Sequence, residues 1–430
     1  MKKIWRTVIA LVASLSVWAA VSPTPTLAAT NVNVDAKAAL AVDAKTGQIL
    51  YAKNADQKLP IASMTKMISL YLVLQAVHDG KLKWTDTVSP DQSIYELAKD
   101  RSLSGVPLEP ENKYTIKELY DASVIYSAND AMMLLANALA GSQANFVDQM
   151  QTQLKKWGIN DADIVNVTGL NNSALKTDRV AGTGDNAENE MSAKDMAIVA
   201  SHLLNDYPEI LNTTSIASQV FRKGTSDETK MDNYNWMLKG LVSAQGDLPV
   251  DGLKTGTTDL AGNCFTGTVK KNGYRIITVV LHANGTASTR RFDQTAALMR
   301  AVFAAWKPLV ATKANQAVAG HAKLAIDKGK QSSVALKATS TIELLVPQTT
   351  TAKDLTYTYH ANKGFSDKAE APVKKGTTTG TVTVNVKGEQ LSYLSKAGNQ
   401  TTLKTTKTAE KANFFVLLFR GIGEFFGNLF

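Results

Sequence analysis

Sulfur and imidazole are scarce in this chain of 430 residues, which contains a single cysteine, Cys264, and five histidines. One cysteine cannot form an intramolecular disulfide. Its apolar context, NCFTGTV, is typical of a small core residue rather than of a catalytic thiol. The histidines lie far apart, with no HExxH motif or other ligand spacing. We therefore expect no metal and no cofactor.

The N-terminus has the layout of a secretory signal peptide. Lys2, Lys3 and Arg6 precede an uncharged run from 7 to 21, which is followed by prolines and by small residues up to Ala28. A transmembrane helix is the alternative, but the run is short for crossing a bilayer and is followed by small residues typical of a signal-peptidase cleavage site. We expect residues 1–28 to be a signal peptide and the chain to be exported.

Negative charge is also in short supply. Lysine and arginine number 47 against 38 aspartates and glutamates, and the formal charge is +9. For an exported protein with lysines spread along its length, this charge favours anionic wall polymers or lipid head groups over nucleic acid as partners. The length and the 44% hydrophobic composition allow two or three domains with cores of their own.

The hydrophobic patterns divide the chain into a mixed domain and a β domain. The segment AALAVDAKTGQILYAKN predicts a hairpin, residues 115–205 are mainly helical in pattern, and 250–283 predict three strands followed by a helix. A sheet built from both ends of a segment that encloses helices is an α+β domain, here 30–306. Alternating runs rich in Thr, Lys and Val then predict a small β-sandwich-like domain at 309–398.

The last residues predict a linker at 399–412 and an amphipathic helix at 413–430. On a helical projection Arg420 and Glu424 fall on the polar side, and these central charges argue against a membrane span. The apolar side consists of Phe414, Phe415, Leu418, Ile422, Phe425, Phe426 and Leu429.

A serine and a lysine interrupt the apolar stretch PIASMTKMISLYLVL. Ser63 and Lys66 are three residues apart, so a helix would place them on one face. The pair is a nucleophile beside a candidate base. Lysine can act as a base only after losing its proton, which burial and a nearby cation both promote. The apolar surroundings of Lys66 supply the burial.

The Ser-x-x-Lys spacing alone is weak evidence, because Ser173 and Lys176 match it too. Two further boxes in a fixed order discriminate between the two pairs, since S-x-x-K followed by S-D-N and K-T-G is typical of class A β-lactamases and penicillin-binding proteins. Only Ser63 precedes both 127–129, which reads SAN, and 254–256, which reads KTG. A second KTG, at 45–47, falls in the predicted hairpin turn, and we interpret it as structural.

With these motifs the chain resembles the low-molecular-mass penicillin-binding proteins, which are serine-type D-alanyl-D-alanine carboxypeptidases. The segments DGLKTGTTDLAG and NYNWML are also similar to that family. The resemblance implies a serine β-lactamase/penicillin-binding-protein-like catalytic domain that trims the terminal D-alanine from peptidoglycan pentapeptide and is inhibited covalently by β-lactams. It also implies a peripheral position on the outer face of the bacterial cytoplasmic membrane, through the C-terminal helix.

The resemblance implies roles for the catalytic residues. Ser63 would attack the carbonyl between two D-alanines and Lys66 would take its proton, although the identity of the base is disputed for this motif class. Ser127 would relay a proton to the leaving amine. Asn129 would hold the substrate's amide and orient Lys66.

The KTG box would bind the substrate's end. By resemblance, Lys254 and Thr255, beside Gly256, would hold the terminal carboxylate. The N–H groups of Ser63 and Thr257 would form the oxyanion hole.

Two alternatives compete with this interpretation. A class A β-lactamase needs a Glu-x-x-Leu-Asn element after the second box, but EPEN at Glu109 comes too early and EILN at Glu209 is one residue short. A non-catalytic wall-binding adaptor would keep the fold without the chemistry, and the intact boxes argue against it.

Overall fold

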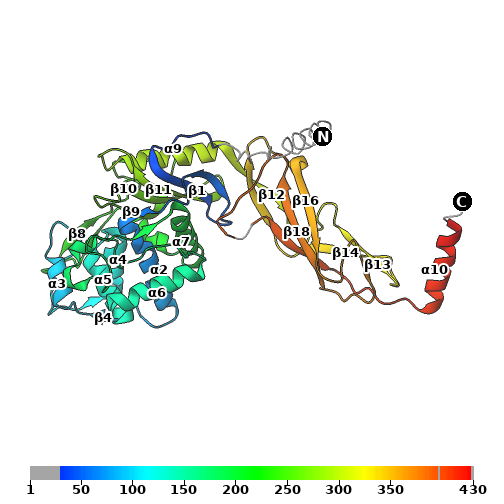
Figure 1. Cartoon of the computed structure of the whole chain (residues 1–430), viewed down its shortest axis with the longest axis horizontal. Helices are drawn as coiled ribbons and strands as arrows, with labels where there is room; N and C mark the ends of the chain where they lie inside the picture. Colours follow the sequence, from blue (N-terminus) through cyan, green and yellow to red (C-terminus); the bar gives the residue numbers. More distant parts are fainter. Residues whose placement is uncertain (1–29, 396–397, 428–430) are drawn as a thin grey trace, which may run out of the picture.

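The computed structural model describes residues 30–395 and 398–427, so the expected signal peptide lies outside the described residues. Figure 1 shows a rounded α+β body, an elongated β domain beside it, and a helix at the far end of the β domain. This arrangement confirms the predicted fold class of a mixed catalytic domain followed by an all-β domain.

A five-stranded antiparallel sheet in the order β2-β1-β11-β10-β9 forms the centre of the first body. The predicted hairpin forms strands β1 and β2, and the three predicted strands at 250–283 form β9, β10 and β11. Side chains alternate between the faces, so Leu40 packs toward the helical layer while Ala39 packs toward α9 (Arg290–Ala305). The strands are β1 (Ala36–Asp43), β2 (Ile49–Lys53), β9 (Val250–Gly256), β10 (Asn263–Lys271) and β11 (Tyr274–Ala283).

Helices cover both faces of this sheet. The helix α2 lies in the middle of the helical layer, and most of its residues are buried, as its unbroken apolar pattern predicts. A short 3₁₀ turn, η1 (Ala62–Thr65), leads directly into it. The helices are α2 (Lys66–His78), α3 (Gln92–Ala98), α4 (Ile116–Ile125), α5 (Asn129–Ala140), α6 (Gln143–Lys156), α7 (Ala193–Asp206), α8 (Ile210–Thr214) and α9 (Arg290–Ala305).

Short strands join the layer as three pairs: β3 (Leu59–Pro60) with β6 (Glu190–Met191), β4 (Thr87–Val88) with β5 (Tyr114–Thr115), and β7 (Ser218–Phe221) with β8 (Thr229–Asp232).

The β domain contains a two-stranded and a six-stranded sheet. The first pairs β12 (Trp306–Thr312) with β15 (Ile342–Pro347). The second has the order β16-β18-β19-β14-β13-β17. Its strands are β13 (Lys323–Asp327), β14 (Ser333–Ala338), β16 (Leu355–Ala361), β17 (Lys368–Glu370), β18 (Thr378–Val386) and β19 (Gln400–Thr405).

The linker expected at 399–412 is wrong. Strand β19 occupies its first half and pairs with both β14 and β18 inside the six-stranded sheet. Its polar sequence, QTTLKT, conceals a strand because Thr401 and Thr405 are buried beside Leu403, with hydroxyls bonded to backbone carbonyls. The start expected at 309 also falls inside β12, which begins at Trp306.

A buried amide joins the two bodies. Gln48 donates from Nε2 to the carbonyl of Leu345 (2.6 Å) and accepts at Oε1 from the Leu345 N–H (3.1 Å). Next to it, the Leu394 N–H donates to Gly47 O. The first KTG copy, 45–47, therefore lies in the β1–β2 turn at the domain interface, where it has a structural role.

The terminal helix α10 (Phe414–Gly427) lies beyond the end of the six-stranded sheet (Figure 1). Arg420 donates to the carbonyls of Gly329 (2.8 Å) and Lys330 (2.7 Å), in the turn between β13 and β14. Phe414, Phe415 and Phe419 are about 70% exposed. Among the described residues, no helix combines the length and hydrophobicity required to span a bilayer.

Candidate active site

Ser63 and Lys66 meet where η1 passes into α2. Ala62 has a positive φ of 48° and turns the chain into the 3₁₀ turn that carries Ser63, while Lys66 is the first residue of α2. The Nζ of Lys66 lies 3.0 Å from Oγ of Ser63. A left-handed backbone at a non-glycine residue is typical of a constrained functional site.

The Lys66 amine is completely enclosed by protein. Besides Ser63, it contacts Oδ1 of Asn129 at 2.7 Å and the carbonyl of Thr168 at 2.9 Å. Burial, and then the charge of Lys254, lower the pKa of Lys66 well below its usual value, and the carboxylate of Asp130 only partly opposes this. The lowered pKa shifts the amine toward the neutral form that a general base requires.

The second motif forms the turn between α4 and α5. Ser127 adopts a φ of 56°, and its buried Oγ has no hydrogen-bond partner in the part of the chain that the structure describes. Asn129, the first residue of α5, donates from Nδ2 to Ser104 O (2.9 Å), which directs its Oδ1 toward Lys66. An unpaired buried hydroxyl is costly, so this one is available for a substrate.

The third motif lies on edge strand β9, which packs directly on η1. A Cβ at Gly256 would lie 2.4 Å from Ile61 O, so only glycine allows this approach. Lys254 is buried, and burial followed by the charge of Arg291 lowers its pKa to about 7. Its Nζ donates only to Thr255 O (3.3 Å) among the described residues, so it remains able to bind an anion.

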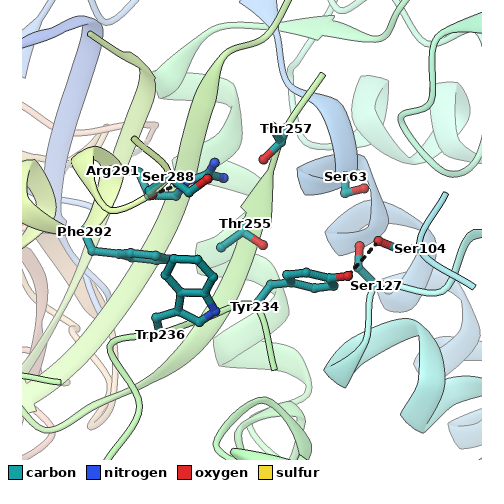
Figure 2. A pocket seen from close by; sticks show the side chains of 10 residues that line it. All are labelled: Ser63, Ser104, Ser127, Tyr234, Trp236, Thr255, Thr257, Ser288, Arg291 and Phe292. Carbon is teal, nitrogen blue, oxygen red and sulfur yellow. Dashed lines mark hydrogen bonds between the residues drawn. The ribbon is translucent and has the colours of Figure 1, made fainter. Parts of the chain in front are cut away.

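A cavity of about 220 Å³ connects the motifs. Figure 2 shows Thr255 and Thr257 on one side of it, with Ser63 and Ser127 facing them across the opening. Tyr234 reaches between the two sides, with its hydroxyl 3.3 Å from Oγ of Ser104.

Several cavity residues escaped the sequence analysis. Arg291 of α9 is 3% exposed, and its guanidinium donates to Gly256 O (2.8 Å) and Cys264 O (3.1 Å). No local motif indicates Arg291, because its position depends on how α9 packs over the sheet. Tyr234 and Trp236 belong to the NYNWML segment, which carried a family resemblance but no assigned role. Ser104, Ser288 and Phe292 complete the lining.

The rival motifs lie elsewhere. Oγ of Ser173 bonds to Oδ1 of Asn171, and Lys176 lies in a separate 3₁₀ turn. Neither lines the cavity, and neither Glu109 nor Glu209 is among its described lining residues.

A serine beside a buried lysine, an S-x-N turn and a KTG box on the edge strand of a five-stranded sheet define a class of serine acyl-enzymes, the penicillin-recognising serine hydrolases. Comparison with known proteins agrees. A family model described as D-alanyl-D-alanine carboxypeptidase matches residues 24–285, and the C-terminal domain of penicillin-binding protein 5 matches 310–411.

Individual relatives cover most of the chain. D-alanyl-D-alanine carboxypeptidase DacF of Bacillus subtilis (strain 168) is 30% identical over 390 residues, which are 91% of this chain and 90% of DacF. The crystal structure of a peptidoglycan synthesis regulatory factor (PBP3) from Streptococcus pneumoniae is 34% identical, with a TM-score of 0.74, and the match covers 88% of this chain and 100% of that one. Penicillin-binding protein D2 from Listeria monocytogenes, in its ampicillin-bound form, is 32% identical with a TM-score of 0.51, over 64% of this chain and 99% of that one.

The chain belongs to the D-alanyl-D-alanine carboxypeptidase family. It is a serine-type carboxypeptidase of cell-wall metabolism that works through an acyl-enzyme and is inhibited by β-lactams. The expected family and activity are confirmed.

Proposed function

We propose that Ser63 is the nucleophile of this carboxypeptidase and that neutral Lys66 is its base. The observation that supports this most directly is the 3.0 Å separation of Nζ and Oγ at a fully buried lysine. A neutral amine has two N–H bonds and one electron pair. The two N–H groups donate hydrogen bonds to Asn129 Oδ1 and Thr168 O. The electron pair is therefore directed at the hydroxyl of Ser63.

In acylation, Oγ of Ser63 attacks the carbonyl carbon of the penultimate D-alanine and its proton passes to Lys66. Ser127 then donates its hydroxyl proton to the amide nitrogen and receives the proton held by Lys66, so the C–N bond breaks, D-alanine leaves and Lys66 is neutral again. The N–H groups of Ser63 and Thr257 hold the oxyanion. Water next attacks the ester with Lys66 as base, which releases the shortened peptide and restores the hydroxyl of Ser63.

The cavity end next to β9 receives the terminal carboxylate. Lys254 supplies charge and Thr255 a hydroxyl, while Gly256 allows β9 to approach η1 and Asn129 holds the substrate's amide. Arg291, which lines the cavity, adds a second buried cation. A site with these cations requires a free carboxylate, because without one they would remain unpaired in a buried setting.

The nucleophile is tested by mass spectrometry after exposure to penicillin G. We expect one penicilloyl adduct, mapped to the peptide containing Ser63, in the mature protein and in Ser173→Ala, and none in Ser63→Ala. An adduct on Ser173, or none at all in the unmodified protein, contradicts the assignment.

D-Alanine release and penicillin hydrolysis are then measured side by side. Rapid penicillin turnover without D-alanine release would favour the β-lactamase alternative.

We also propose that residues 1–28 direct export and that α10 holds the enzyme on the outer face of the cytoplasmic membrane. The exposed phenylalanines 414, 415 and 419 support this, since full burial of each would contribute about 1.5–3 kcal/mol. Because Arg420 points toward the β13–β14 turn, its charge need not enter the bilayer. Removing 413–430 should leave D-alanine release intact and move the enzyme to the soluble fraction. An unchanged fractionation contradicts the anchor.

A further inference from the structure

The positive charge of this protein is concentrated in the β domain. Residues 309–412 contain fifteen lysines against seven aspartates and glutamates, whereas residues 30–308 contain 28 lysines and arginines against 30 acidic residues. The catalytic domain is thus close to neutral, and the excess charge belongs to a domain to which the acyl-enzyme mechanism assigns no role. Such asymmetry is typical of a domain that contacts a polyanion.

Two lysines of this domain lie directly opposite each other in the six-stranded sheet. Lys337 of β14 is the register partner of Lys404 of β19, and both are exposed. Lys323 of β13 pairs with Ala335, one step along the same face from Lys337. Side chains at directly opposed positions are about 5 Å apart at Cβ, and like charges there are destabilising. None of the three lysines forms an ion pair with a described residue.

Hydroxyl groups continue this face away from the lysines. Thr402 precedes Lys404 by two residues and therefore shares its side of the sheet. It pairs with Thr381 of β18, and Thr383 follows on the same side. The opposite side carries the hydrophobic core, with Leu336, Val382 and Leu403. We call the outward surface of Lys323, Lys337, Thr381, Thr383, Thr402 and Lys404 the lysine–threonine face.

The position of the face separates it from the proposed membrane contact. Arg420 fixes α10 to the carbonyl of Lys330 in the turn before β14, whereas Lys337 lies four residues beyond Ser333, the first residue of that strand, roughly 13 Å further at the rise of an extended strand. Figure 1 shows α10 beyond the end of the sheet rather than alongside it. Attraction to a charged bilayer is screened within about 8 Å at physiological salt. A bilayer that receives α10 is therefore too distant to neutralise Lys337 and Lys404.

We propose that the lysine–threonine face binds a linear wall polymer of the poly(polyol phosphate) type. The phosphates of such a chain would lie between the opposed ammonium groups and relieve their repulsion, and its polyol oxygens would bond to the threonine hydroxyls. Binding would hold the catalytic domain within the polymer-rich wall next to its peptide substrates. This inference goes beyond the carboxypeptidase reaction and does not depend on it.

The test uses the mature full-length protein and poly(glycerol phosphate) as the probe, with calorimetric titration at salt concentrations between about 50 and 200 mM. The variant is Lys337→Gln with Lys404→Gln. The control is Lys353→Gln with Lys387→Gln, because these two lysines are also exposed in the β domain but lie beside Asp354, outside the lysine–threonine face. Binding to phosphatidylglycerol vesicles and D-alanine release are measured on all three proteins.

We expect the 337/404 variant to bind the polymer roughly tenfold more weakly. The slope of log affinity against log salt concentration should become about 1.4 less steep, as expected when two phosphate contacts with a flexible strand are lost. The control variant should change less than about twofold, and vesicle binding and D-alanine release should be unchanged. Absence of polymer binding by the unmodified protein, or equal losses in both variants, overturns the proposal. A loss of vesicle binding as large as the loss of polymer binding assigns the face to the bilayer and also overturns it.

Discussion

The carbonyl oxygen of Thr168 lies 2.9 Å from Nζ of Lys66, although 102 residues separate them in the chain. A buried asparagine holds the loop that presents this carbonyl. Asn189 accepts at Oδ1 from the N–H groups of Val165 and Asn166, and donates from Nδ2 to Oγ1 of Thr65 and to Asn166 O. Asn189 thereby connects the 166–169 loop to the turn that carries the nucleophile.

We predict that Asn189→Ala slows acylation by penicillin by about 10²-fold, because a shift of the Thr168 carbonyl by about 1 Å misdirects the electron pair of Lys66. The rate is measured with a fluorescent penicillin on protein that circular dichroism shows to be folded. Asn399→Ala, which removes a buried asparagine from the β domain, should leave the rate unchanged. A folded Asn189→Ala with the normal rate contradicts the role of Asn189 in positioning.

The pH profile of kcat/KM should be bell-shaped. Lys66 acts only when neutral, so activity rises as the pH increases through its depressed pKa. Lys254 binds a carboxylate only when charged, so activity falls as the pH rises through its pKa, about 7 in the empty site. Lys254→Arg should move the alkaline limb upward by more than about two pH units, since a guanidinium stays protonated. Movement of the acid limb instead would reverse the assignment.

Gly169 should tolerate no side chain. A Cβ at this position would lie 1.8 Å from Ala62 O, a backbone atom next to the nucleophile. The φ of Gly169 is 81°, which also disfavours a side chain. We expect Gly169→Ala to abolish penicillin binding or folding. Gly158→Ala is the matched control, because its φ is 83° but nothing lies within 4 Å. It should cost only the left-handed backbone penalty, about 1–2 kcal/mol in the free energy of unfolding. Equal melting temperatures and penicillin binding for the two variants would contradict the clash.

Reversing one charge of the opposed pair should stabilise the β domain. Lys404→Glu replaces a like-charge pair with an opposite pair across β14 and β19, and we expect a gain of about 0.2–1 kcal/mol in chemical unfolding at low salt. The gain should disappear at high salt, where Coulomb interactions are screened. Lys353→Glu lacks a cross-strand lysine partner and should show no comparable gain. A destabilised Lys404→Glu would contradict the repulsion.

The predictions from sequence succeeded where the information is local. The order of the three motifs indicated the family, the apolar surroundings of Lys66 indicated its burial, and hydrophobic patterns predicted the β1–β2 hairpin and the strands at 250–283. Periodicity failed at β19, because threonines can occupy buried positions when their hydroxyls bond to backbone carbonyls, and a hydropathy pattern does not record those bonds. The sequence also did not predict that Lys337 and Lys404 lie opposite each other, since strand register follows from pairing between distant segments.

The sequence by itself determined which groups the chemistry can use: a serine and a lysine one helical turn apart, a serine–asparagine turn and a KTG strand. Only the tertiary structure decided that they work together. The Thr168 carbonyl, the β9 edge and Arg291 come from segments far apart in the chain, and their approach to η1 depends on close packing at Gly169 and Gly256. Burial by these segments depresses the pKa of Lys66, and burial is a property of the folded chain rather than of the residues on either side of a lysine.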